Sequence, residues 1–186
     1  MMSSSSFSFG DRVRLHIKAG QITGQITTDS IVNYVYADDI YGRCGIIEAA
    51  GDDVRQEYDE KRLPKDHLQS TLVLTTGAGN LPYKAILHVE VSTVLPKFSD
   101  TIHRALKLAE RRGMRSIAFP AMKCTPENKQ YIARYLQVFY EFERRVRPAC
   151  LHMIDIVASN TEDQEYHEEQ TTQMGERLYG DSDDSD

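Results

Sequence analysis

Residues 30–35 read Ser-Ile-Val-Asn-Tyr-Val, a short and largely β-branched run that predicts a buried strand. Ala85-Ile-Leu-His-Val89 and Ser116-Ile-Ala-Phe-Pro120 are two further runs of the same character. Segments with helical periodicity separate these runs, such as residues 46–58, where Ile46 and Val54 belong to one apolar stripe. Strands that alternate with helices predict a sheet covered by helices on both faces. We therefore expect an α/β fold, a three-layer α/β/α sandwich with a mixed sheet of about six strands.

The remaining elements follow from the same patterns. Strands are expected over residues 13–17, 71–75 and 151–157. One helix should begin at Ser99 or Asp100 and stop at Gly113, and another should run from Pro126 to about residue 145. Ser159-Asn-Thr-Glu162 has the pattern of a capping box and predicts a terminal helix.

Charge is unevenly distributed along the 186 residues. The chain has 22 basic and 28 acidic residues, a net charge of −6. Ten of the acidic residues but a single basic one lie beyond residue 160, so the preceding body carries +3. We expect a disordered Ser-rich arm over 1–11, one domain over 12–179 that includes the terminal helix, and an acidic tail over 180–186.

Several classes of protein are excluded by composition. No stretch approaches the roughly 20 apolar residues that cross a bilayer, so we expect no membrane partner. The N-terminus lacks the pattern of a secretory signal. Three cysteines are too few for a disulfide framework, and their spacing fits no metal site. These features predict a reducing, intracellular location, cytoplasmic or nuclear, with no bound metal.

Several ordered blocks carry a family resemblance. Gly20-Gln-Ile-Thr23, Asp29-Ser-Ile-Val-Asn33 and Glu48-Ala-Ala-Gly51 resemble the first third of a macrodomain, the ADP-ribose-binding module. Thr76-Gly-Ala-Gly-Asn-Leu-Pro-Tyr-Lys-Ala-Ile-Leu-His88 and the block 116–120 resemble the later strands of that family. The resemblance covers residues 12–160 and implies ADP-ribose or an ADP-ribosylated protein as partner, with no cofactor.

The resemblance also implies which residues would contact the ligand. Gln21 and Ile22 would face adenine, with Gln21 standing where the family has an Asp. Asn33 and Tyr36 would lie beside the ribose, with Tyr36 in place of the family's ribose-binding Asn. The two phosphate loops would be formed by Gly42, Arg43, Cys44, Gly45 and Ile46, and by Ala121, Met122, Lys123, Cys124 and Thr125.

Both phosphate loops depart from the family pattern. The family uses glycines there because backbone amides must approach the pyrophosphate closely. The first loop keeps Gly42 and Gly45 but inserts Arg43 and Cys44, and the second loop has no glycine. In one interpretation the cations Arg43 and Lys123 replace the lost amide donors. In the other, the inserted side chains fill a site that is no longer used.

The residues that hydrolytic members of the family use are also replaced. The ribose-binding Asn corresponds to Tyr36, and the Asp of the first loop corresponds to the pair Arg43 and Cys44. No carboxylate is then an evident general base, so we predict no catalytic residue and a weak or degenerate, non-catalytic nucleotide-binding module. The competing hypothesis is an ADP-ribosyl hydrolase in which Asp38 or Asp39 substitutes.

A different class of function remains open. Cations cluster near the ends of two expected helices, and such clusters attract nucleic acid. The chain could therefore bind RNA, or serve as a protein-interaction macrodomain that has lost ADP-ribose recognition. The two clusters are Arg104, Lys107, Arg111, Arg112 and Arg115, and Arg144, Arg145 and Arg147.

Overall fold

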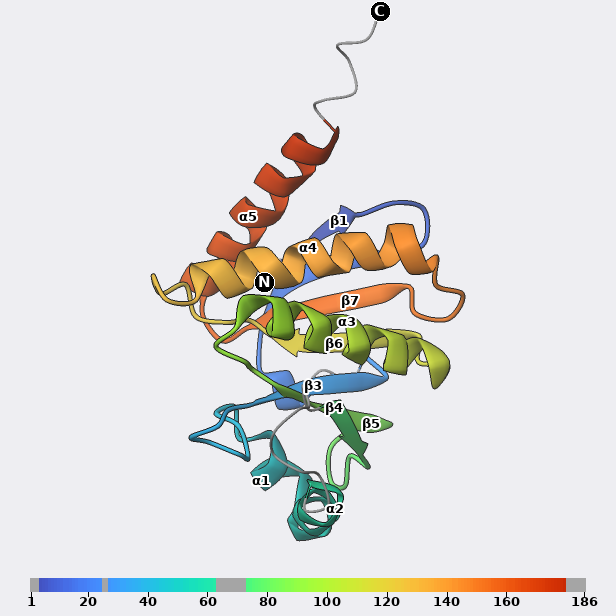
Figure 1. Cartoon of the computed structure of the whole chain (residues 1–186), viewed down its shortest axis with the longest axis vertical. Helices are drawn as coiled ribbons and strands as arrows, with labels where there is room; N and C mark the ends of the chain where they lie inside the picture. The colour runs from blue at the N-terminus through green and yellow to red at the C-terminus, as the bar shows by residue number, and fades with distance from the viewer. Residues whose placement is uncertain (1–3, 25–26, 63–72, 180–186) are drawn as a thin grey trace, which may run out of the picture.

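The computed structural model describes residues 4–24, 27–62 and 73–179 (Figure 1). One sheet of seven strands has the order β1-β2-β7-β6-β3-β5-β4. The strands are β1 (Ser4–Ser8), β2 (Arg14–Ala19), β3 (Ser30–Val35), β4 (Val73–Thr76), β5 (Ala85–Glu90), β6 (Ser116–Pro120) and β7 (Met153–Ala158). The helices are the single 3₁₀ turn η1 (Ile22–Gly24), α1 (Ile46–Ala50), α2 (Asp52–Arg62), α3 (Leu95–Arg111), α4 (Lys129–Val146) and α5 (Thr161–Tyr179).

Strand direction decides where the loops meet. The five inner strands β2, β7, β6, β3 and β5 are mutually parallel, whereas β1 and β4 pair antiparallel at the two outer positions. Strands β3 and β6 pair only at Ser30↔Ile117 and Ile31↔Ala118, whereas β3 and β5 pair over their full length. The sheet therefore opens between β3 and β6 toward the carboxyl ends of the strands, where open α/β sheets bind ligands.

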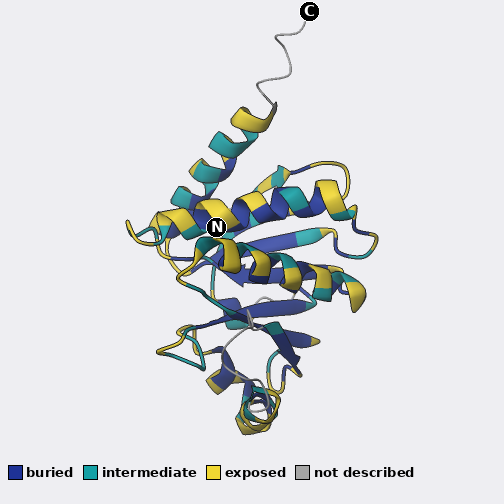
Figure 2. Cartoon of the chain, viewed as in Figure 1, coloured by how far each residue is buried: buried dark blue, intermediate teal, exposed yellow. Residues whose placement is uncertain are grey.

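Two apolar clusters lie on opposite faces of the sheet. Side chains of α3 and α4, including Ile102 and Phe139, pack with Leu15 and Ile17 of β2. Side chains of α1 and α2 pack with Ile31, Ile86, Ala118 and Val157 on the other face. Buried positions concentrate on the strands and on the sheet-facing sides of the helices (Figure 2). The three-layer α/β/α sandwich with a mixed sheet is confirmed.

The sheet has one strand more than expected, because part of the segment 1–11 is ordered. Strand β1 pairs with β2 in the register Phe7↔Leu15, which contradicts the disordered arm predicted over these residues. Phe7 packs against the main apolar cluster and Phe9 is buried in it. The hydroxyl of Ser5 also donates to Glu168 at 2.8 Å. The alternation of Phe with Ser thus favours a strand, although the Ser-rich composition by itself predicts disorder.

Several helix ends differ from the expected ones. The helix expected over 46–58 is two helices, broken at Gly51, whose φ is 100°. Helix α3 begins at Leu95, ahead of Ser99, because Pro96 suits a first turn. The cap of α5 is Asn160, whose Oδ1 accepts from the Asp163 amide at 2.8 Å, one position after the expected cap. Residues 71–72 of the expected strand and the acidic tail 180–186 lie outside the described residues.

Glu143 of α4 fixes the turn that leads into β2. Its carboxylate is buried and accepts the amides of Arg12 at 2.7 Å and Val13 at 2.5 Å. Gly10 lies directly against this side chain, where a Cβ would be 2.8 Å from Glu143 Cδ.

Replacing Glu143 by Ala should lower the free energy of unfolding by about 3 kcal/mol, because two amides then lose a charged acceptor. Glu143→Gln should lose less, since one amide oxygen remains. Urea denaturation of both variants measures the difference. Glu141→Ala, on the same helix in a long ion pair with Arg145 (3.8 Å), is the control and should change stability by under about 1 kcal/mol. Equal losses for Glu143→Ala and this control would contradict the role of Glu143.

Candidate functional site

The predicted site residues lie at the edge of the sheet where the parallel strands end. Gln21 and Ile22 follow β2, Tyr36 follows β3 and Ala121 follows β6. Helix α1 begins at the end of the first loop, after Gly45. The structure therefore brings the predicted adenine, ribose and phosphate segments to one edge, around the opening between β3 and β6.

The first loop, residues 36–45, folds back against strand β3. The amides of Tyr36 and Gly42 both donate to the carbonyl of Asp39, at 2.9 and 3.2 Å. Gly42 has φ 85°, and a Cβ at this position would lie 2.5 Å from the carbonyl oxygen of Tyr34. Glycine is therefore required here both by conformation and by space. Within the described residues, no hydrogen bond is found for the amides of Arg43, Cys44 and Gly45, which precede α1.

Asn33 anchors this loop from within the sheet. Its side chain is fully buried and donates to the Tyr41 carbonyl at 3.0 Å. It also lies 3.2 Å from Nδ1 of His88 on β5, whose Nε2 lies 2.9 Å from the hydroxyl of Thr76 on β4. Because Thr76 itself donates to the Gly77 carbonyl, the consistent tautomer of His88 accepts from Asn33 and donates to Thr76. Asn33 thus holds the backbone, and its predicted ribose contact remains a prediction.

The inserted Arg43 lies at the surface of the first loop. Its guanidinium stacks over the ring of Tyr36 at 4.1 Å from the centroid and lies 3.2 Å from both oxygens of Asp38. The side chains of Arg43 and Asp38 are 57% and 77% exposed. Burial raises the pKa of Tyr36, and the charge of Arg43 opposes that shift. An exposed ion pair of this kind is worth under about 1 kcal/mol, so a phosphate can displace Asp38.

The second loop, residues 121–125, is tied to the protein body through its backbone. The Ala121 amide donates to Val157, and the Thr125 amide donates to Lys123. The Cys124 amide donates to the buried carboxylate of Asp163 at 2.8 Å. These amides are therefore already bonded within the protein.

A buried chain of hydrogen bonds supports the same loop from below. The Met122 backbone hydrogen-bonds the Tyr135 oxygen, and the Tyr135 hydroxyl contacts Nε2 of His167 on α5. Nδ1 of His167 lies 2.6 Å from the Asp163 carbonyl and donates to it. Burial lowers the pKa of His167, which favours the neutral ring that this chain requires. Helix α5 thus fixes the second loop through Asp163 and His167.

The two loops face each other across the opening. Neighbouring protein atoms raise the pKa of the Cys44 thiol, and the positive charge of Lys123 opposes that shift. Lys123 is exposed, so its ammonium is available to a ligand at this edge. Arg43 and Lys123 therefore place two cations around the mouth of the site.

Three predicted contact residues have buried side chains. Ile22 and Ile46 pack in the apolar cluster beneath α1, and Met122 packs in the cluster beneath α4. The Ile22 carbonyl also accepts from the Tyr83 hydroxyl. These residues can reach a ligand only through their backbone, whereas Gln21 is exposed where β2 ends.

The sequence patterns did not point to Asp163, His167 or Tyr135. A signal for Asp163 was present, since Asn160 and Asp163 have capping-box spacing one residue beyond the predicted pair. The contact of Asp163 with Cys124 spans 39 residues and has no local signature.

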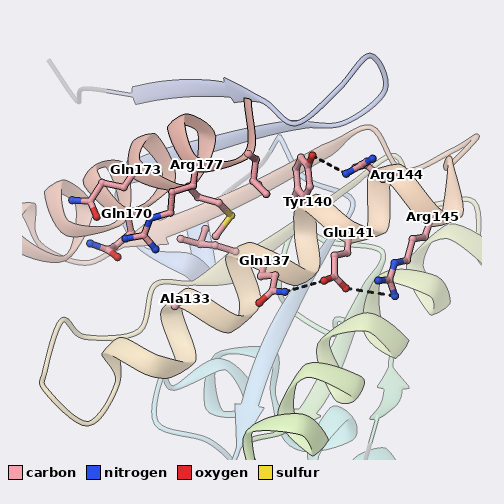
Figure 3. A pocket seen from close by; sticks show the side chains of 12 residues that line it. Ala133, Gln137, Tyr140, Glu141, Arg144, Arg145, Gln170, Gln173 and Arg177 are labelled. Carbon is pink, nitrogen blue, oxygen red and sulfur yellow. Dashed lines mark hydrogen bonds and ion pairs between the residues drawn. The ribbon is translucent and has the colours of Figure 1, made fainter. Parts of the chain in front are cut away.

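A separate cavity of about 650 Å³ lies between α4 and α5, away from this edge (Figure 3). Tyr140, Met174 and Leu178 contribute apolar surface to it. The described residues contain no group of three or more His, Cys, Asp or Glu that could hold a metal ion. None of the described helices is long and apolar enough to cross a membrane.

The buried network makes stability depend on the protonation of His88. Burial lowers its pKa from 6.5 to about 3. The unfolded chain therefore binds a proton below about pH 6.5 that the folded chain excludes, and stability falls as the pH drops toward 3. Urea unfolding should show the advantage of wild type over His88→Gln shrinking by about 2.5 kcal/mol between pH 7 and 4.5. An equal pH dependence in the two proteins would contradict this.

The close approach of Gly42 to β3 predicts a large effect of one methyl group. Gly42→Ala should lower the free energy of unfolding by about 3 kcal/mol or more, because the Cβ overlaps backbone that cannot move away. Gly45→Ala is the matched control, since Gly45 has φ 63° but open space around its Cβ, and it should cost about 1 kcal/mol. Thermal and urea unfolding compare the two, and similar losses would refute the steric argument.

Comparison with known proteins agrees with this geometry. The Macro domain family model matches residues 43–128. An O-acetyl-ADP-ribose deacetylase from Escherichia fergusonii is 33% identical over 124 residues, which cover 59% of this chain and 67% of that protein. A solved Oceanobacillus iheyensis macrodomain with ADP superimposes with a TM-score of 0.75 at 20% identity, over 95% of this chain and 99% of that chain. A Trypanosoma brucei macrodomain in complex with ADP gives a TM-score of 0.69 at 20% identity, over 84% and 68%. The chain belongs to the macrodomain family.

Proposed function

We propose that this macrodomain binds ADP-ribose, or a related nucleoside diphosphate, at the loops that follow β3 and β6 and does not hydrolyse it. The observation that carries the proposal is the replacement of backbone amide donors by side-chain cations at the mouth of the site. The Cys124 amide of the second loop is bonded to Asp163, while Arg43 and Lys123 present exposed cations at the same mouth. Side-chain charge thus takes over part of the role of backbone amides.

The first loop keeps the features that suit a phosphate. Gly42 and Gly45 both have positive φ, and the amides from Arg43 to Gly45 make no hydrogen bond among the described residues. Successive amides in such a turn form a concave anion site. Arg43 adds a planar guanidinium that can hold a phosphate through two parallel hydrogen bonds. One phosphate therefore fits this loop, and Lys123 on the facing loop can pair with the other.

This arrangement predicts weak binding. Arg43 must release Asp38, and both cations must lose rotamer freedom when they bind. A preformed cradle of backbone amides avoids that entropy loss. The second loop cannot supply the Cys124 amide without breaking its bond to Asp163.

The carboxylates near the mouth argue against hydrolysis. In the unliganded protein both oxygens of Asp38 face Arg43, which neutralises the carboxylate. Asp163 is buried and bonded to Cys124 and Asn160. Asp38 is released only when a phosphate takes Arg43, and Asp39 lies near Tyr36, so these two carboxylates are the ones that an assay of hydrolysis has to test.

Hydrolysis remains the competing hypothesis, because the relative from Escherichia fergusonii is named a deacetylase of O-acetyl-ADP-ribose. Incubation of the purified protein with O-acetyl-ADP-ribose and with an ADP-ribosylated protein tests it. We expect no product above the level of a heat-inactivated control. Turnover that disappears in the double variant Asp38→Ala, Asp39→Ala would replace the proposal with the hydrolase.

Isothermal titration with ADP-ribose tests binding directly. We expect saturable binding that weakens about tenfold in Arg43→Ala and in Lys123→Ala, the loss of roughly one charge-assisted hydrogen bond each. Lys107→Ala, which removes an exposed cation near the far end of α3, is the matched control and should bind as wild type. AMP should bind more weakly than ADP, since it offers one phosphate fewer. Absence of heat at millimolar ADP-ribose, or equal affinities in all variants, would reject the proposal.

A further inference from the structure

The opposite edge of the sheet, where the parallel strands begin, gathers six arginines and a histidine from four separate segments. Helices α3 and α4 also end there, because each precedes one of these strands. All of these side chains are exposed. We call this surface the basic edge and define it as Arg12, Arg14, Arg111, Arg112, Arg115, Arg147 and His152.

Backbone contacts join these segments. The Arg12 guanidinium donates to the carbonyls of Arg147 and Pro148, at 3.5 and 3.3 Å. The Arg14 amide donates to the His152 carbonyl at 2.9 Å, and the His152 amide donates to the Arg115 carbonyl at 3.1 Å. Residues more than 130 positions apart in the chain are therefore neighbours on this surface.

Three acidic residues near the basic edge are engaged elsewhere, whereas Asp11 is exposed beside Arg12. Glu110 accepts the amides of residues 149–151 at 2.7 to 3.1 Å, and Glu143 accepts those of Arg12 and Val13. Asp29 pairs with Lys84 and accepts the Arg115 amide. Among the described residues, none of the six arginines of the basic edge forms an ion pair. Their charge is therefore presented to solvent.

The helix dipoles account for part of this charge only. The C-termini of α3 and α4 each carry roughly half a negative charge, which favours nearby cations. Six guanidinium groups exceed that requirement several-fold. Arg147 moreover ends α4 with φ 51°, the one non-glycine residue with positive φ in the described ranges, where Gly or Asn would be less strained. Helix capping alone therefore does not explain an arginine at this position.

Arg144 and Arg145 do not belong to this surface, although they are next to Arg147 in sequence. Arg144 donates to the Tyr140 hydroxyl at 3.2 Å, and Arg145 pairs with Glu141. Both line the cavity between α4 and α5 (Figure 3). Orientation on the helix thus separates them from Arg147.

A cavity of about 490 Å³ opens within the basic edge. Arg12, Arg14, His16 and His152 line it, together with the acidic Asp11. Nδ1 of His152 donates to the Cys150 carbonyl at 2.9 Å, and Nδ1 of His16 faces the buried Asp155 at 3.4 Å. The bond to Cys150 holds the imidazole of His152, whose ring is a flat surface beside the arginines.

We propose that the basic edge binds the backbone of single-stranded nucleic acid, with phosphates on the arginines and a base in the cavity beside His152. Arginine holds phosphate through two hydrogen bonds, and a ring such as imidazole stacks on any base. The surface lies at the opposite end of the parallel strands from the candidate ADP-ribose site, so it is additional to that site.

The composition of the surface favours nucleic acid over a membrane or an acidic protein. Among the described residues, the exposed large hydrophobic side chains are Val94 and Leu178, and neither lies on the basic edge. A lipid surface would therefore gain no apolar anchor here. The basic edge is formed mainly by arginine, which suits bidentate phosphate contacts, and the neighbouring Lys84 is paired with Asp29.

Fluorescence anisotropy with a short labelled oligouridylate tests the proposal. Wild type should bind at about 50 mM salt, with affinity that falls steeply toward 200 mM, at a slope of about −0.7 per phosphate contacted. The triple variant Arg14→Ala, Arg112→Ala, Arg115→Ala should weaken binding at least tenfold and reduce that slope by about 2. None of these three side chains makes a hydrogen bond among the described residues, so the variant should fold.

The matched control removes the same charge elsewhere. Lys97→Ala, Arg134→Ala, Arg177→Ala deletes three exposed cations outside the basic edge and should bind RNA as wild type. Equal weakening in both triple variants would show a net-charge effect and overturn the proposal. Equal affinity for polyglutamate or for anionic phospholipid vesicles would also overturn it. Titration of the Arg14, Arg112, Arg115 variant with ADP-ribose should match wild type, which separates this surface from the proposed function.

Discussion

Strands β3 and β6 separate after two paired residues, and the candidate site depends on that separation. Beyond Ile31 and Ala118 the two strands no longer share hydrogen bonds, so an opening forms between their carboxyl ends. The first loop turns back along β3 at this point, with Gly42 against the Tyr34 carbonyl. A fully paired sheet would leave no room between the two loops. The position of the site is therefore set by strand pairing, and the side chains determine only what the site can bind.

The two loops beside the opening are stabilised in different ways. The first is held by the buried amide of Asn33, which bonds the Tyr41 carbonyl and leaves the amides near Gly45 exposed to a ligand. The second is held by Asp163, whose carboxylate accepts a hydrogen bond from the Cys124 amide, so this amide is not available to a ligand. A loop that bonds its own amides is rigid but offers fewer donors. Recognition then shifts to long cationic side chains, which bind with a larger loss of entropy.

The sequence predicts the strands of this fold better than its turns. Runs such as 30–35 and 116–120 match β3 and β6 residue for residue, because buried parallel strands are continuous apolar runs. Strand β1 was missed because its serines resemble a disordered arm, although Phe7 and Phe9 alternate as in a strand. The bond between Asp163 and Cys124 could not be predicted, since it depends on how α5 packs beside β6 and not on any local pattern. For the same reason, only the structure reveals that the Cys124 amide of the second loop is already hydrogen-bonded.

Parallel strands also explain why the charge pattern is concealed in the sequence. They bring the starts of β2, β6 and β7 and the ends of two helices to one edge, so arginines as far apart in the sequence as Arg12 and Arg147 become neighbours. The net charge of −6 does not reveal this basic surface, because acidic residues such as Glu110 and Glu143 accept hydrogen bonds from backbone amides and do not pair with the arginines. The strands between the two edges have six residues or fewer, about 20 Å at roughly 3.3 Å per residue. That distance exceeds the screening length of about 8 Å at physiological salt. Anions at the two edges therefore interact weakly, and the fold can hold a nucleotide at one edge and a phosphate backbone at the other.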